Sequence, residues 1–158
     1  MWTQIMRADK LLQLKRSPFR RKFHLSRLDR MILEQKGMEK IREDAKALLS
    51  KTLQSPSTDA RVPYNGHPVF TAQHATATCC RECLFKWHRI PVFRELTEKE
   101  IEYLTGLVVR WIEKEHERHV MRGLQDSHRY TIERKKHSYT PSTLNYYIAQ
   151  QPKGVSVL

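Results

Sequence analysis

All three cysteines of the chain and three of its eight histidines fall in one short segment, HPVFTAQHATATCCRECLFKWH, at positions 67–88. Thiolate and imidazole groups are the usual ligands of zinc, and a structural zinc site takes four of them in a tetrahedron. Cys80 and Cys83 have the CxxC spacing that is typical of such ligand pairs. The segment therefore predicts a zinc site made by His74, Cys80, Cys83 and His88, with Cys79 and His67 as substitutes.

The same segment also fits an interpretation without metal. The stretch ATATCCRECLFKWH contains no glycine or proline and is compatible with one continuous helix. On such a helix Cys79 and Cys83 share a face, where small side chains allow close packing against a neighbouring helix. The two interpretations differ in how far the stability of the domain depends on metal. A structural zinc ion contributes on the order of 10 kcal/mol to folding, so chelation is expected to unfold the domain only if metal is bound.

Catalysis is predicted less strongly than metal binding. A thiolate beside Arg81 and Lys86 would have a lowered pKa, but no strand-rich sequence precedes the CxxC pair, as a thioredoxin-like motif requires. A zinc deaminase needs a glutamate two positions after its histidine ligand, whereas His74 is followed by Ala75 and Thr76. Paired carboxylates that would hold magnesium are also missing from the segment. No catalytic residue is therefore predicted.

The charge of the chain is strongly positive and uneven. Lysine and arginine outnumber aspartate and glutamate 29 to 17, for a net charge of +12, and the excess is largest in the first 30 residues. A positive surface attracts polyanions, of which nucleic acid is the commonest, although an acidic protein partner fits the charge as well. Phe19 and Phe23 flank a basic triplet that they could anchor. The residues predicted to contact DNA or RNA are Lys15, Arg16, Arg20, Arg21, Lys22, Arg27, Lys86 and Arg89.

The composition of the chain places it among soluble proteins of the cytoplasm. Hydrophobic residues make up 39% and charged residues 29%, and no apolar run has the length that a membrane span needs. Arg7, Asp9 and Lys10 interrupt the N-terminal segment before the apolar core of a signal peptide can form. Three clustered cysteines, an odd number, do not suit a disulfide framework. A reducing compartment is expected.

Helix signals surround the central segment on both sides. Ser26 with Asp29 predicts a helix start, and Gly37 predicts its end. A second helix is predicted from Met38 to Leu53 by apolar residues at spacings of three and four. Thr97 with Glu100 has the spacing of a capping box, and it precedes the clearest apolar stripe of the chain, formed by Ile101, Leu104, Val108, Trp111 and Ile112.

These signals predict a mainly α fold, a small helical domain with a His- and Cys-rich central segment and flexible basic termini. The expected parts are a basic N-terminal extension at 1–18, a helical domain at 19–117 and a basic C-terminal tail at 118–158. The tail contains few aliphatic residues, too few to offset the entropy lost when a chain is ordered. A frayed helix followed by disorder is expected there.

Two stretches carry a resemblance to a known family. GHPVFTAQHATATCCRECLFKWHRIP, followed by LTEKEIEYLTGLVVRWIE, resembles the signature of the bacterial and phage family called domain of unknown function 4186. The resemblance extends upstream and covers roughly 19–117. In that family a histidine tends to stand at the position of Asp44, and a glycine at that of Glu82. The resemblance implies a shared pattern and no established activity.

The function predicted from these observations is that of a zinc-stabilised nucleic-acid-binding accessory protein of phage or mobile-element origin. The metal would fix the scaffold, and the basic residues would dock on phosphates. Two other functions stay open. One is a metal-dependent hydrolase that acts on nucleic acid. The other is a modulator whose basic face binds an acidic surface of a host DNA-handling enzyme.

Overall fold

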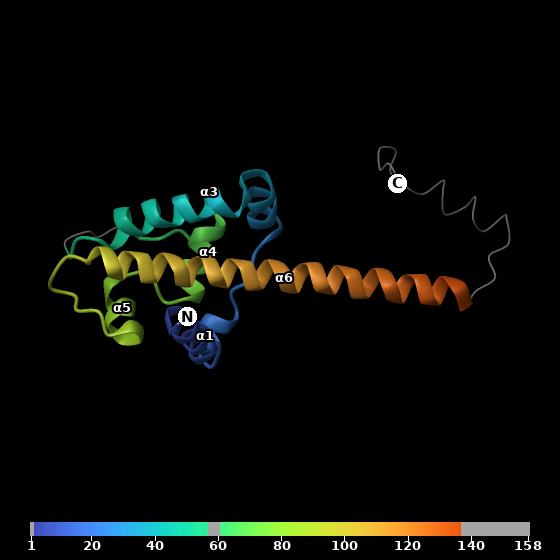
Figure 1. Ribbon diagram of the computed structural model, residues 1–158, viewed down its shortest axis with the longest axis horizontal. Coiled ribbons are helices and arrows are strands. Elements are labelled where there is room, and N and C mark those ends of the chain that lie inside the picture. Colours follow the sequence, from blue (N-terminus) through green and yellow to red (C-terminus); the bar gives the residue numbers. More distant parts are fainter. Residues whose placement is uncertain (1, 57–60, 137–158) are drawn as a thin grey trace. The chain divides into compact units, whose positions relative to one another are not determined.

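The computed structural model of the protein describes residues 2–56 and 61–136. Six helices follow one another along the chain (Figure 1): α1 (Trp2–Lys15), α2 (Pro18–Arg21), α3 (Arg27–Leu53), α4 (Pro68–Ala75), α5 (Arg81–His88) and α6 (Glu98–Lys136). The described residues contain no strand, which confirms the predicted mainly α fold. None of these helices combines the length and the apolar character that crossing a membrane requires.

The chain divides into two compact units, Met1–Arg118 and His119–Leu158. The first contains α1 to α5, the first part of α6 and every residue of the sites described below. Of the second, the structure describes residues 119–136, which continue α6. The disordered segment predicted at the end of the C-terminal tail falls at 137–158, outside the described residues.

The predicted helix starts are present with their hydrogen bonds. Ser26 and Asp29 form a reciprocal capping box, in which each side chain accepts from the backbone N–H of the other at 3.0 Å. Thr97 and Glu100 make the same pair of bonds ahead of α6. Gly37 interrupts α3 with φ 78° and ψ 159°, a left-handed φ that glycine adopts at little cost. The two helices predicted on either side of Gly37 are thereby confirmed.

One aliphatic core holds the first unit together. Helices α3 and α6, with their predicted apolar stripes, supply more of it than the other helices do, and α4 packs against α3 with Val69 and Ala72 fully buried. The stretch predicted as an N-terminal extension contains α1, whose Leu11 and Leu14 belong to the same core. Residues buried on the two stripes are Ile41, Ala45, Leu49, Leu53, Ile101, Leu104, Val108, Trp111 and Ile112.

The central segment is not one continuous helix, as it was expected to be in the interpretation without metal, while close packing of the cysteines without metal stays open. Helix α4 ends at Ala75, and Ala77 has φ 57°, which breaks the helical path before α5 begins. The buried hydroxyls of Thr76 and Thr78 hydrogen-bond to each other at 3.0 Å, and Thr76 also donates to the Ala72 carbonyl at 2.7 Å. Such hydroxyls compete with the backbone for hydrogen-bond partners, which lets a helix stop without glycine or proline.

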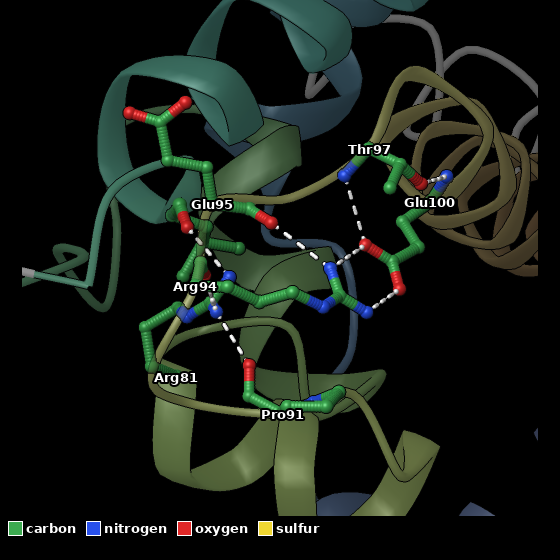
Figure 2. Close-up of polar contacts among 7 residues, drawn as sticks. Arg81, Pro91, Arg94, Glu95, Thr97 and Glu100 are labelled. Atoms are coloured by element: carbon green, nitrogen blue, oxygen red, sulfur yellow. Dashed lines mark hydrogen bonds and ion pairs between the residues drawn. The ribbon is translucent and has the colours of Figure 1, made fainter.

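The connection from α5 to α6 is fixed by two arginines (Figure 2). Arg81, buried at the start of α5, donates to the carbonyls of Leu53, Pro91 and Arg94. Arg94 in turn holds the Glu100 carboxylate with two bonds of 2.8 and 2.9 Å. These bonds tie the end of α3 and the loop before α6 to the beginning of α5. They therefore position the cysteines, which flank that beginning.

Candidate metal centre

The structure brings the three cysteines together. Their sulfur atoms all lie within 4.8 Å of one another, and the Sγ atoms of Cys79 and Cys83 are 3.7 Å apart. Each of the three is partly exposed, and each is free. Within the described part of the chain they are the one group of three or more His, Cys, Asp or Glu side chains with this spacing. Three thiols at such distances can close around a single soft metal ion.

The three cysteines lie where the chain passes from α4 into α5. Cys80 is the N-cap of α5, in extended backbone, and its sulfur accepts the backbone N–H of Cys83 at 3.4 Å. Cys79 precedes the cap and is released from helical geometry by the turn at Ala77. On a continuous helix Cys83 would also neighbour both other cysteines, because it is three positions from Cys80 and four from Cys79. The turn at Ala77 ends α4 before this group and leaves Cys80 as the N-cap of α5.

The thiols line a cleft of about 820 Å³. His74, at the end of α4, and Tyr64 line the same cleft, and their rings are stacked with centroids 4.2 Å apart. Arginine side chains give it a positive character. The lining consists of Phe19, Arg20, Thr52, Pro56, Arg61, Val62, Tyr64, His74, Cys79, Cys80, Arg81, Glu82, Cys83 and Val92.

Arg20 is bonded directly to the thiols. Its guanidinium donates to the His74 carbonyl at 2.7 Å, to the Cys83 sulfur at 3.1 Å and to the Cys79 sulfur at 3.6 Å, and the residue is only 8% exposed. The hydrogen bond with Cys83, together with the hydrogen bond and charge of Arg20, lowers the pKa of Cys79 to about 7. The contact with Cys79 and burial raise the pKa of Cys83, and burial raises that of Cys80. The group therefore favours one thiolate, at Cys79, when no metal is bound.

His74 presents a nitrogen suited to metal binding. Its Nε2 lies 3.1 Å from the carbonyl oxygens of Val62 and Pro63, so Nε2 carries the proton and donates it. The other nitrogen, Nδ1, then keeps its lone pair. Burial lowers the pKa of His74, which keeps the ring neutral near pH 7. A ligating histidine commonly donates its second N–H to a backbone carbonyl in this way.

The other two candidate histidines lie outside the lining of the cleft. His67 caps α4, since its Nδ1 accepts from the Val69 N–H at 3.1 Å and its Nε2 contacts Asp44 at 3.2 Å. His88, at the end of α5, donates from Nε2 to the Thr76 carbonyl at 2.9 Å. Burial lowers the pKa of His88 to about 4. Of the predicted ligand set, the structure brings together Cys80, Cys83 and the substitute Cys79, and His74 lines the same cleft without belonging to this group.

The predicted nucleic-acid contacts divide into two kinds. All but one are exposed, and Lys22 lies over the rings of Phe19 and Phe23 at 4.3 and 5.5 Å, as the flanking aromatics indicated. Arg20 is the exception, because its guanidinium is buried against the thiols. The exposed ones are Lys15, Arg16, Arg21, Lys22, Arg27, Lys86 and Arg89.

Sequence reasoning missed two arginines that build the site. Arg20 was interpreted as a surface cation, and the buried hydrogen bonds of Arg81 were not foreseen. Arg20 is 63 positions from Cys83, and no local pattern connects them. Arg20 stands between Phe19 and Phe23 in the sequence, and Phe23 packs against the core, but this does not indicate a contact with the thiols.

Comparison with known proteins agrees with the motif. The family model described as Domain of unknown function (DUF4186) matches residues 8–113. The chain belongs to this family. The match confirms the resemblance seen in the sequence, and it begins within α1 instead of at residue 19. All three cysteines, His74 and Arg20 lie inside the DUF4186 region. No solved structure matches the chain.

Proposed function

We propose that this DUF4186 protein binds one zinc ion through Cys79, Cys80, Cys83 and His74, and that the zinc-stabilised domain docks on nucleic acid in the cytoplasm. One observation carries the metal site: three sulfurs within 4.8 Å of one another, in a cleft that His74 also lines. Three cysteines and one histidine form a ligand set that structural zinc sites use. Bound zinc would hold the turn at Ala77 and the start of α5 together.

The charges around the thiols support this ligand set. Three thiolates and Zn²⁺ carry a net charge of −1 when the fourth ligand is a neutral histidine. The Arg20 guanidinium, in contact with two of the sulfurs, supplies the compensating positive charge. Groups that hydrogen-bond to metal ligands commonly contribute 10-fold to 100-fold to metal affinity. Arg20 thus has a function in the zinc-bound protein that a surface cation would not have.

Zinc content tests the site. After loading with zinc and removal of the excess, elemental analysis is expected to find one zinc per chain, and Cys83→Ser is expected to lose it. His74→Ala should weaken binding, and Arg20→Gln should lower zinc affinity about 10-fold to 100-fold. His119→Ala, an exposed histidine outside the site, is the matched control and should retain the metal. If His74→Ala bound zinc with unchanged affinity and His88→Asn lost it, His74 would not be the fourth ligand.

Nucleic-acid docking rests on the exposed cations near α2. Arg21 and Lys22 lie in and just after this helix, and Arg16 and Arg27 lie on either side of it. Phe19, which is 41% exposed, lies among them and can stack on a base while the cations contact phosphates. The net charge of +12 favours the encounter with any nucleic acid.

Salt dependence tests this docking. The logarithm of the affinity for duplex DNA is expected to fall linearly with the logarithm of the salt concentration, with a slope of about 0.9 per phosphate neutralised. The double variant Arg21→Glu, Lys22→Glu should bind more weakly and with a shallower slope. The control Lys51→Glu, Lys99→Glu makes the same change in net charge in α3 and α6. Equal losses in both variants would show that only total charge matters.

One observation favours a second candidate, a zinc-dependent hydrolase acting on nucleic acid. The ligands face an open cleft, and Glu82 is the single carboxylate among the described residues of its lining. A zinc ion on the three cysteines alone would leave a position for water, which Glu82 could deprotonate. Incubation of the zinc-loaded protein with labelled DNA and RNA separates the two functions, because a docking protein leaves the strands intact.

A further inference from the structure

Cys79 and Cys83 are placed for a reaction that zinc binding does not use. Their sulfurs are 3.7 Å apart without a bond between them. A disulfide has an S–S distance of about 2.05 Å, so the two atoms need to approach by less than ~2 Å. Both border the cleft of about 820 Å³, which is wide enough to admit a small reagent.

The third cysteine is less suited to such a bond. The sulfur of Cys80 caps α5 by accepting the Cys83 N–H, and pairing it with another sulfur would remove this cap. Cys79 has no capping function and follows the turn at Ala77, which has already left helical geometry. Arg20 contacts the sulfurs of Cys79 and Cys83 and holds them side by side.

We propose that Cys79 and Cys83 form a reversible disulfide by exchange with a low-molecular-weight disulfide. The Cys79 sulfur attacks one sulfur of the reagent, whose S–S bond breaks, and one half leaves as a thiol with the proton from Cys79. The Cys83 sulfur then attacks Cys79 in the mixed disulfide. The Cys79–Cys83 bond forms, and the second half leaves as a thiol with the proton from Cys83. Two protein thiols are oxidised, and the reagent is reduced to two thiols.

The consequence for metal binding rests on the proposed function. A disulfide between Cys79 and Cys83 removes two of the three thiolates from the zinc set, and a disulfide sulfur is a poor zinc ligand. Oxidation would therefore release the metal, and bound zinc would protect the thiols from exchange. The disulfide itself forms in the zinc-free protein and does not depend on this step.

Exchange of the full-length, zinc-free protein with oxidised glutathione tests the disulfide. The number of free thiols is expected to fall from three to one. Alkylation followed by peptide mapping should identify the remaining free thiol as Cys80. Reduction with dithiothreitol should restore all three thiols. Cys80→Ser should still form the bond, since serine keeps the helix cap. Cys79→Ser leaves Cys80 and Cys83, and Cys83→Ser leaves Cys79 and Cys80. Neither variant should form a disulfide between its two remaining cysteines.

The contrary results are equally distinct. A bond mapped between Cys80 and Cys83 in the unmodified chain, or glutathione that stays attached to Cys79, would overturn the proposal. Circular dichroism of each variant shows whether it is folded, and Cys80→Ser alone already separates the two pairings. Zinc-loaded protein should resist the same reagent, and a chain that binds no zinc but still forms the Cys79–Cys83 bond would refute only the metal site.

Discussion

Replacing Arg81 with methionine is expected to lower the free energy of unfolding by about 3 kcal/mol. The guanidinium is buried and donates to three backbone carbonyls, those of Leu53, Pro91 and Arg94. Methionine has a similar length and no donor, so buried carbonyls lose their partners at a cost of about 1 to 3 kcal/mol each. Part of the loss is offset, because the Arg81 Nε is already buried without a partner.

Urea denaturation followed by circular dichroism, in zinc-free buffer, measures this change. Arg94→Met is the matched control, since Arg94 belongs to the same network in Figure 2 but its side chain is 39% exposed in its ion pair with Glu100. Exposed pairs contribute about 1 kcal/mol or less. Equal destabilisation of the two variants would mean that the buried carbonyl bonds of Arg81 do not stabilise the domain.

The helices could be predicted from the sequence because their signals are local. A cap needs residues three positions apart, such as Ser26 and Asp29, and both partners are adjacent in the chain. The stripe from Ile101 to Ile112 has the helical period, and it is buried as that period requires. These two kinds of signal account for most of α3 and for the first part of α6.

The site was predicted less completely because its decisive contacts are not local. Nothing near Arg20 in the sequence indicates that its guanidinium reaches Cys83. The end of α4 was missed for a different reason. At this stop the buried hydroxyls of Thr76 and Thr78 bond to each other, Thr76 also donates to the Ala72 carbonyl, and neither glycine nor proline marks the stop in the sequence. The three sulfurs converge just after this stop, while His88 pairs with the Thr76 carbonyl outside the cleft lining.

Removing zinc from the loaded protein is expected to lower the free energy of unfolding by about 4 kcal/mol, when free zinc had been at a thousand times its Kd. For a domain of this size the midpoint of thermal unfolding should fall by about 15 °C. The loss is smaller than the complete unfolding expected from the sequence alone. The zinc-free domain is expected to stay folded because of its core, in which Ile41, Leu49 and Leu104 are fully buried on α3 and α6. Those helices stay packed when the start of α5 loosens.

Thermal unfolding in zinc and in a chelator measures the difference, and Cys83→Ser is the control that links it to the site. This variant should melt at one temperature in both buffers, because without the Cys83 thiolate the remaining ligands do not hold the ion. A zinc-dependent shift of similar size in Cys83→Ser would place the metal elsewhere, since ligand-linked stability requires binding at the site that was removed. The absence of a shift in the unmodified protein would favour the close-packing interpretation of the three cysteines, in which their sulfurs contact one another and Arg20 without a metal.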